Sequence, residues 1–570
     1  MTGCALARQM IQETNNNQKE EVHVHVFDWG RSSGGRASHR HRPEPLINNA
    51  NNNKNNDDHH NNHKDDTVEQ SMLLQLHFDH GAQFFHADHP EFLDMIRPAI
   101  QSWPTHLSRL GWLDGETGAF TTTAPDSHSD SDSTSLGFFG SGHGAFEPHR
   151  YVGTGGMDAI CQEMLHIPPP TAVGSALPTG HGRIHIHQAT RVARCEYNEQ
   201  PERSMSSSDN DKKNPNNETK RWKLFGDGLG HEQADAKTLQ TSQQSQVLLG
   251  EFDELVVTDH MAAAMPSWHP CHIQGLERVV PHVISTLRTR LDWDESERRF
   301  RAVQPLFSCM VAFERDTDKN NNNNNNDNND GNGDVGMGHS VSCLHVEYDA
   351  ATVQGNPILQ WVCSQESRTH GTNEDDTSST LERWILMSTT KFAKTCLGSE
   401  GMSKTVPSSS STTKVDAGAD SKVATLDDTQ KDTQQVQYIP QTDEYLRSDP
   451  AQIMCDEFIK LVKQSHRVKG EHHVVPDVVF RKCQRWGAAY TVPLSHQDYH
   501  RWESTLRSYE SSHHFTLCGD FLKDGSSEKY LSRVDKETAT YSHAIQDAAL
   551  SGIDAAKRIV DRIRTRTTTL

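Results

Sequence analysis

Polar, low-complexity tracts interrupt this chain repeatedly, and they constrain its folding more than any other feature. Only 33% of the 570 residues are hydrophobic, whereas an ordinary globular chain contains about 45–50%. The deficit is concentrated in tracts rich in Asn, Ser, Thr, Asp or Gln, namely Asn48–Asp66, Thr121–Ser135, Glu202–Lys220, Glu232–Gln246, Asn320–Asn332, Asn373–Thr380 and Ser399–Gln435. Because these tracts lack apolar periodicity, we expect disordered insertions around about 400 residues that build one large domain or two interleaved ones.

The charge balance and the cysteines narrow the class of protein further. The chain carries 56 Lys and Arg residues against 77 Asp and Glu residues, a net charge of −21. We expect no nucleic-acid partner, because nucleic-acid binding needs a basic surface, and no membrane partner, because no run of about 18 apolar residues occurs. The 11 cysteines form no C-x-x-C pair and no secretory signal is visible. We therefore expect reduced thiols and an intracellular location, cytoplasmic or in an organelle.

The amino-terminal segment predicts a helix, a strand and a glycine-rich turn. Apolar residues recur at helical spacing after Gly3, and Val22–Asp28 alternates as a strand does. Asp28 ends this strand at roughly the offset of about 20 residues at which dinucleotide-binding units place a ribose-binding carboxylate. Gly34 and Gly35 would let the backbone approach a pyrophosphate. A simple turn residue at the strand end is the alternative interpretation of Asp28.

These motifs resemble the renalase-like branch of the FAD-dependent amine-oxidase-type flavoproteins. Proteins of that family begin with the motif G-x-G-x-x-G, which is followed by a helix, a strand that ends V-F-D, and the motif G-G-R-x-S/T. In this chain, only the end of the first motif is present, at Met1–Gly3. The first strand and first two glycines of the motif are absent from the sequence, so we expect that it starts at an internal Met; a degenerate protein that cannot hold FAD is the alternative. The resemblance implies FAD-binding roles for the following residues: Thr2, Gly3, Asp28, Arg31, Gly34, Gly35 and Arg36.

A second signature follows the first Asn-rich tract. Leu74–Phe78 alternates as a strand, and Asp79–Phe85 reads D-H-G-A-Q-F-F. The renalase-like family carries a near-identical D-x-G-A-Q-[YF]-[FI] segment, which implies that Gly81, Ala82, Gln83 and Phe84 lie beside the flavin. A polar strand end for Gln83 and a core position for Phe84 remain the alternative. Helical patterning over Phe92–Leu110 predicts a helix of the substrate domain.

The carboxyl-terminal region holds another signature. Phe515–Asp520 reads as a strand that ends in Gly519 and Asp520, and an apolar stripe from Ile545 to Ile563 predicts a final helix. By resemblance, Asp520 binds the ribityl hydroxyls of the flavin, whereas an isolated Asp would be a turn residue. Trp486 resembles a family tryptophan that could line the substrate cavity, although a core position is the alternative.

Together these patterns predict an α/β fold with a Rossmann-type FAD-binding domain, its first strand apparently missing, interleaved with an α+β substrate domain. The FAD-binding domain would comprise residues 1–90, 150–266 and 491–570. The substrate domain would comprise residues 91–149 and 267–490, and it would include the apolar strands Phe307–Phe313, Leu359–Cys363 and Trp384–Ser388. The long polar insertions would interrupt both domains.

The expected function is that of an FAD-dependent oxidoreductase. By resemblance, non-covalent FAD would take a hydride from a small amine or a dihydropyridine, a reduced nicotinamide being one candidate, and O2 would reoxidise the flavin to give H2O2. A polyamine-oxidase-like or desaturase-like flavoenzyme is an alternative, and so is a non-catalytic protein that keeps the fold for interactions. The sequence identifies no catalytic side chain. The 35 histidines form no metal-binding motif, so we expect solvated imidazoles and no metal site.

Overall fold

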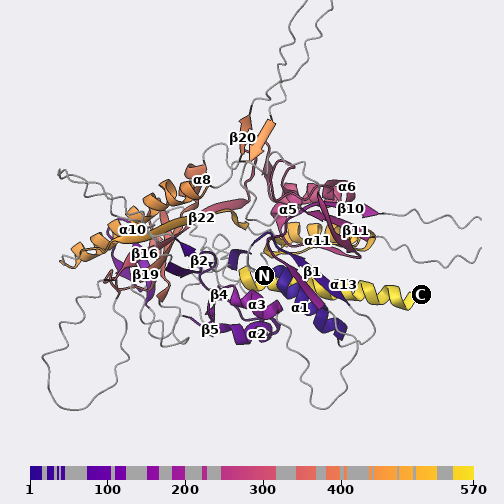
Figure 1. Ribbon diagram of the computed structural model, residues 1–570, viewed down its shortest axis with the longest axis horizontal. Coiled ribbons are helices and arrows are strands. Elements are labelled where there is room, and N and C mark those ends of the chain that lie inside the picture. Colours follow the sequence, from indigo (N-terminus) through magenta and orange to yellow (C-terminus); the bar gives the residue numbers. More distant parts are fainter. Residues whose placement is uncertain are drawn as a thin grey trace, which may run out of the picture.

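The structure is a computed structural model, and it describes the chain in segments. The described residues are 1–15, 22–30, 35–37, 40–44, 74–103, 109–122, 150–165, 183–198, 221–226, 246–315, 342–366, 381–397, 403–406, 435–438, 442–470, 474–491, 496–522 and 544–569. They form a mixed α/β fold with several sheets (Figure 1). Among the described residues, no helix is long and apolar enough to cross a membrane.

The largest sheet lies at the left of Figure 1, and α10 (Asp449–Val468) packs against one of its faces. Its strand order is β22-β16-β19-β18-β17-β6-β7, and only the β17–β6 pair is parallel. The bounds are β6 (Leu110–Asp114), β7 (Phe120–Thr121), β16 (Val303–Glu314), β17 (Ala350–Gln354), β18 (Leu359–Ser364), β19 (Leu381–Ser388) and β22 (Val478–Thr491).

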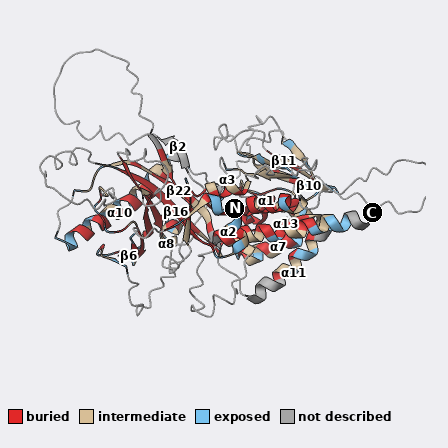
Figure 2. Ribbon diagram, turned by 90° about the horizontal axis from the view of Figure 1, so that it is seen from below, coloured by how far each residue is buried: buried red, intermediate tan, exposed pale blue. Residues whose placement is uncertain are grey.

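This sheet is buried on both faces. Along β16, Met310 and Ala312 belong to one hydrophobic core, whereas Phe307, Val311 and Phe313 belong to another. The alternation follows the two-residue period of a strand, so each face of the sheet contributes to a separate core. Figure 2 shows the buried residues gathered in this sheet and in α1 (Thr2–Asn15).

Two pairs of parallel strands make the second part of the fold. Strand β1 (His23–Phe27) pairs with β9 (Arg183–His187), and β13 (Leu255–Val257) pairs with β23 (Phe515–Leu517). Helices α1 (Thr2–Asn15) and α13 (Ala544–Thr569) pack together with residues of these strands in one core.

A three-stranded antiparallel sheet packs beside these pairs. It consists of β10 (Val192–Asn198), β11 (Arg221–Gly226) and β12 (Val247–Phe252). Phe252 meets the His25 and Phe27 rings edge-on, with ring centroids at 5.2 and 5.8 Å. A smaller sheet has the order β4 (Phe85–His86), β8 (Arg150–Gly153), β5 (Ile100–Ser102), and it lies near α2 (Pro90–Ile96) and α3 (Ala159–Leu165) in Figure 1.

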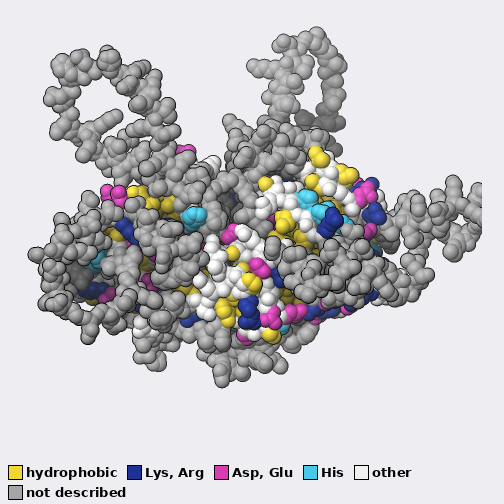
Figure 3. Space-filling model, turned by 60° about the horizontal axis from the view of Figure 1, so that its bottom comes forward, with side chains coloured by type: hydrophobic (Ala, Val, Ile, Leu, Met, Phe, Trp, Pro, Cys, Tyr) yellow, Lys and Arg dark blue, Asp and Glu magenta, His cyan; other side chains and the backbone are white. Residues whose placement is uncertain are grey.

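The remaining elements are short connections and peripheral helices. They are η1 (Gly35–Ala37), β2 (Arg40–Glu44), β3 (Leu74–Phe78), β4 (Phe85–His86), α2 (Pro90–Ile96), η3 (Arg97–Ala99), β5 (Ile100–Ser102), β8 (Arg150–Gly153), α3 (Ala159–Leu165), α5 (His260–Ala264), α6 (Leu276–Val279), α7 (Pro281–Arg290), β14 (Trp293–Asp294), β15 (Arg299–Phe300), α8 (Thr390–Leu397), β20 (Ser403–Val406), β21 (Gln435–Tyr438), α9 (Asp443–Arg447), α11 (His496–His513) and η8 (Asp520–Leu522). Figure 3 shows acidic and basic side chains mixed on one face of the molecule.

Two predictions about secondary structure were wrong. The helix predicted over Phe92–Leu110 ends at Ile96, where Arg97 and Pro98 begin a 3-10 turn that leads into β5. Proline has no N–H and clashes with the preceding turn, so it ends an α-helix. Within the tract Ser399–Gln435, predicted to lack structure, Thr405 and Val406 pair with β21, as suits β-branched residues. The other polar tracts lie mostly outside the described residues.

Candidate cofactor site

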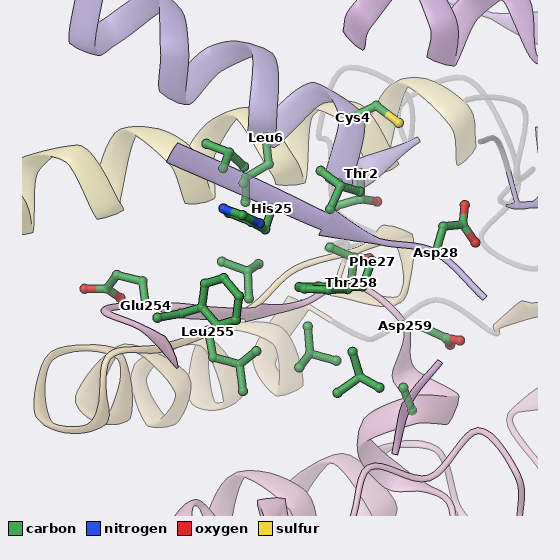
Figure 4. A pocket seen from close by; sticks show the side chains of 18 of the residues that line it. Thr2, Cys4, Leu6, His25, Phe27, Asp28, Glu254, Leu255, Thr258 and Asp259 are labelled. Carbon is green, nitrogen blue, oxygen red and sulfur yellow. The ribbon is translucent and has the colours of Figure 1, made fainter. Parts of the chain in front are cut away.

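A large cavity lies between β1 and β13, beneath the amino end of α1 (Figure 4). Its volume is about 1240 Å³, which exceeds the roughly 300–1,000 Å³ of most small-molecule pockets. Five residues predicted to bind the cofactor line it, and they come from four separate segments: Thr2, Gly3, Asp28, Gly35 and Asp520. Trp486, predicted to line a cavity, also contributes to its wall.

Asp28 is fixed where β1 ends. Its N–H donates to the His187 carbonyl at 3.0 Å, and its carbonyl accepts from the Thr190 N–H at 3.0 Å. The Gly30 N–H donates to the Asp28 carboxylate at 2.7 Å. Burial raises the pKa of Asp28, while the Gly30 hydrogen bond and the Met1 ammonium oppose that rise. The backbone therefore holds one carboxylate oxygen in place, and among the described residues no hydrogen bond engages the other oxygen, which could accept one from a hydroxyl group.

The amino end of α1 supplies backbone donors to the same cavity. Thr2 and Gly3 begin the helix, and the first N–H groups of a helix have no partner within it. Such an end attracts anions such as phosphate. At Gly3, a Cβ would approach only Thr258, at 3.8 Å. The segment is therefore suited to a phosphate group that contacts the backbone.

The glycine-rich turn is described only in part. Gly35 has a φ of +53°, a conformation that favours glycine, and a Cβ there would meet nothing within 4 Å. Arg31 and Gly34 lie outside the described residues, as does the side chain of Arg36. The predicted roles of these three residues stay predictions.

Gly519 and Asp520 lie between β23 and η8. The Gly519 N–H donates to Ser551 Oγ at 3.0 Å, which ties this turn to α13. A Cβ at Gly519 would lie 2.3 Å from the Phe521 ring, so the turn requires glycine. Asp520 then lines the cavity, together with Ile545 from the first turn of α13.

The second signature occupies a different place. Gly81, Ala82, Gln83 and Phe84 are buried, and the residues that line the cavity do not include them. Gln83 Nε2 donates to the carbonyls of Asp79 and Gly81, and Gln365 Nε2 donates to Gln83 Oε1 at 3.1 Å. The contact of these residues with a flavin stays a prediction. Their nearest link to the cavity is His80, whose ring stacks on Trp486 with centroids 5.7 Å apart.

Residues after β13 complete the cavity, and sequence reasoning did not select them. Thr258 and Asp259 follow β13 and line the cavity, and Asp259 caps α5 through the Met261 N–H at 2.8 Å. Asp28 and Asp259 lie at the same end of their strands in Figure 4, and Asp259 contributes to the raised pKa of Asp28. The sequence contained a signal for these residues, because Thr258 and Asp259 follow an apolar strand in the same way that Asp28 ends one.

Comparisons with known proteins found no match in sequence and only a distant similarity in structure. No family model matches this sequence, and no curated protein matches it. Among solved structures, 26 chains match. One is described as a "Putative protoporphyrinogen oxidase" from Exiguobacterium sp. 255-15, with 9% identity and a TM-score of 0.32. The match covers 72% of this chain and 52% of that chain, so it spans about half of that protein's length.

Proposed function

We propose that this protein is a flavin-dependent oxidoreductase of the renalase-like kind, which binds FAD non-covalently in the cavity between β1 and β13. The observation that carries this proposal is the convergence of Thr2, Gly3, Asp28, Gly35 and Asp520 on one cavity. These residues belong to a helix start, a strand end and two turns, which are the features that dinucleotide sites use. The proposal draws no support from the structural likeness of low TM-score.

The cavity residues fit the chemical groups of FAD. The amino end of α1 would hold the diphosphate, and Asp28 would accept hydrogen bonds from the ribose hydroxyls. Asp520, at the other turn, would bind the ribityl chain. Cys518 is fully buried, and burial raises its pKa to about 12. A neutral, buried thiol is a poor nucleophile, so this cysteine supports non-covalent rather than covalent attachment.

FAD, when bound, supplies the two-electron redox chemistry, so the protein has to bind the cofactor, orient the substrate and shield the reaction from water. We propose that the substrate is a small amine or a dihydropyridine, a reduced nicotinamide being one candidate, and that it loses a hydride. We further propose that O2 is the final acceptor and leaves as H2O2. Trp486 would form a wall of the site, since its indole N–H donates to Ser308 Oγ at 3.1 Å and its ring stacks on His80. No side chain is assigned a catalytic role.

Titration of the full chain with FAD tests the proposal. We expect quenching of flavin fluorescence with one FAD per chain. Asp28→Asn should weaken binding by roughly 10- to 100-fold, because hydrogen bonds to a charged group contribute about 1.5–3 kcal/mol. Asp94→Asn is the matched control, since Asp94 forms an exposed ion pair with Arg97. Absence of FAD uptake, or equal affinity of the Asp28 and Asp94 variants, would overturn the proposal.

A substrate screen follows once FAD is bound. Amines and the isomers of reduced nicotinamides are offered under anaerobic conditions, and bleaching of the flavin absorbance identifies the substrate class. Admission of O2 should then restore the absorbance with one H2O2 for each substrate consumed. Bleaching by no member of either class would contradict the substrate part of the proposal.

A further inference from the structure

Two cysteine side chains meet where α1 packs against α3. Cys4 lies in the first turn of α1 and Cys161 lies in α3, and their thiol groups form a hydrogen bond with each other. Both residues belong to the same hydrophobic core. A disulfide needs its sulfur atoms about 2.05 Å apart, so two thiols already in hydrogen-bond contact need only a small movement of their side chains to form one.

Contacts that do not involve the thiols hold the two helices in register. One turn after Cys4, the Arg8 guanidinium donates through Nη1 to the Glu163 carbonyl at 2.7 Å, and it forms an ion pair with the Glu163 carboxylate at 3.8 Å. The Cys161 N–H donates to the Asp158 carbonyl at 3.0 Å, at the start of α3. The two thiols therefore stay opposite each other in the folded protein.

The pair lies at the wall of the cavity. Cys4 is 5% exposed and is one of the residues that line the cavity, whereas Cys161 is fully buried behind it. Figure 4 shows Cys4 beside Thr2 at the amino end of α1. A molecule as small as a hydroperoxide that enters the cavity can therefore reach this thiol pair without unfolding of the chain.

The hydrogen bond between the two thiols also changes their acidity. It raises the pKa of Cys4 and lowers the pKa of Cys161, so the proton stays with Cys4 and the negative charge forms on Cys161. Burial has the opposite effect on thiols without such a partner, since it raises the pKa of Cys195 and that of Cys518 to about 12. The thiolate is the reactive form of cysteine, so the pair is more reactive than those buried thiols.

A second thiol pair in the chain provides a matched contrast. Cys309 and Cys483 are directly opposite each other in the pairing of β16 with β22, and their side chains also form a hydrogen bond. Both are fully buried, and the residues that line the cavity do not include them. Burial and the Cys483 thiol raise the pKa of Cys309 well above its usual value. This pair shares the proximity of Cys4 and Cys161 but lacks their access to the cavity.

We propose that Cys4 and Cys161 are a peroxide-sensitive dithiol pair, which forms a reversible disulfide between α1 and α3. The thiolate of the pair attacks one oxygen of a hydroperoxide, the O–O bond breaks, and a sulfenic acid forms while the leaving oxygen takes up a proton. The other thiol then loses its proton and attacks the sulfenic sulfur, so that the S–S bond forms, the S–O bond breaks and water leaves. Two thiols are oxidised and one peroxide is reduced. The proposed oxidase reaction would be one source of H2O2, but the pair needs no bound flavin.

Oxidation of the full chain without flavin tests the proposal. The reduced protein is treated with a small excess of H2O2, its free thiols are counted, and its disulfides are mapped by mass spectrometry. We expect the loss of two of the 11 thiols, a cross-linked peptide that contains Cys4 and Cys161, and full recovery after addition of dithiothreitol. Cys309 and Cys483 should remain reduced.

Two variants complete the experiment. Cys161→Ser should abolish the disulfide, and a sulfenic acid left on Cys4 should then be captured by dimedone. The matched control is Cys396→Ser, at a half-buried thiol of α8, which should form the disulfide as fully as the unchanged chain. The mapping on the unchanged chain decides the question even if a variant fails to fold.

Three outcomes would overturn the proposal. The first is that peroxide leaves Cys4 and Cys161 reduced, or oxidises them no faster than Cys309 and Cys483. The second is that the disulfide forms only in urea, which would show that the folded protein keeps the sulfurs apart. The third is a cross-link between separate chains that grows with protein concentration. Because no flavin is present, failure of FAD binding would leave each of these results unchanged.

Discussion

Gly552 of α13 lies so close to Thr2 of α1 that a Cβ on Gly552 would stand 2.3 Å from the Thr2 carbonyl oxygen. The two helices that cover the parallel strands therefore cross in backbone contact. This crossing sets the position of the first turn of α1, which lines the cavity. Gly552, which does not itself line the cavity, thus helps to set where the proposed phosphate-binding end of α1 lies.

The first prediction concerns this crossing. Gly552→Ala should lower the free energy of unfolding by about 1–3 kcal/mol, because the added methyl group forces the helices apart. Gly3→Ala is the matched control, since a Cβ there would make only an ordinary contact with Thr258 at 3.8 Å, and alanine favours a helix by about 0.5–1 kcal/mol. Urea denaturation measures both variants. Equal stability of the two variants would show that the helices do not cross as described.

The second prediction concerns the buried amide network around Gln83. Gln83→Leu leaves the Asp79 carbonyl and the Gln365 side chain without this partner, so it should destabilise the fold by about 1–3 kcal/mol. Gln304→Leu, at an exposed hydrogen bond, should change stability by less than about 0.5 kcal/mol. Unchanged stability of the Gln83 variant, combined with lost FAD binding, would instead place Gln83 beside the cofactor.

The third prediction concerns a ladder of imidazoles across β1 and β9. His23 and His25 contact His185 and His187 through ring nitrogens, each pair at 3.0 Å, and the rings stack. These histidines contact one another, and the His23–His185 contact is exposed to solvent. Burial and the neighbouring imidazoles lower the pKa of His25 from 6.5, and burial and His185 lower that of His187.

The lowered pKa values of His25 and His187 determine how stability changes with pH. The folded state favours neutral rings, so the unfolded state binds more protons as the pH falls through 6.5. Stability should therefore decline from about pH 7 downward and level off below the folded-state pKa values. Urea midpoints measured across this range should show a smaller decline in His25→Gln. The exposed His282→Gln variant should keep the full decline, and identical slopes in both variants would contradict the assignment.

The fourth prediction concerns the ion pairs that fasten α13 to α11. Glu510 is 5% exposed, and it accepts two hydrogen bonds from Arg558, both at 3.0 Å, and one from Arg562 at 3.3 Å. Glu510→Gln removes the charge that faces two partly buried guanidinium groups, so we expect a loss of about 1.5–3 kcal/mol. Glu503→Gln breaks an exposed pair on the same helix and should cost less than about 1 kcal/mol. Thermal denaturation compares them, and equal melting temperatures would contradict this prediction.

Strong periodicity made part of the fold predictable. The helix after Gly3, the strands at Val22–Asp28 and Leu74–Phe78, the central strands and the final helix are confirmed within the described residues. Helix α10 was not predicted, although Met454, Phe458 and Leu461 are buried at helical spacing. The apolar pattern of α10 begins shortly after the longest polar tract, Ser399–Gln435. The low hydrophobicity of that tract led to a prediction of disorder there, and the helical pattern after it was overlooked. The domain boundaries stay predictions.

The candidate site was predictable only where local signals sufficed. Asp28, Gly35 and Asp520 each follow a strand, and the resemblance to the renalase-like family implied their shared role. The position of Gln83 was not predictable, because its partner Gln365 lies 282 residues away in the chain. Thr258 and Asp259 were missed because their strand shows no glycine-rich turn after it.

The central claim is that the cavity between β1 and β13 holds FAD through the start of α1, Asp28 and Asp520. The most direct measurement is hydrogen–deuterium exchange of the full chain with and without FAD. We predict slower exchange at Gly3, at Gly30, whose N–H bonds to Asp28, and at η8, with no change on β16. Unchanged exchange at these positions in the presence of saturating FAD, or slowing confined to the large sheet, would contradict the claim.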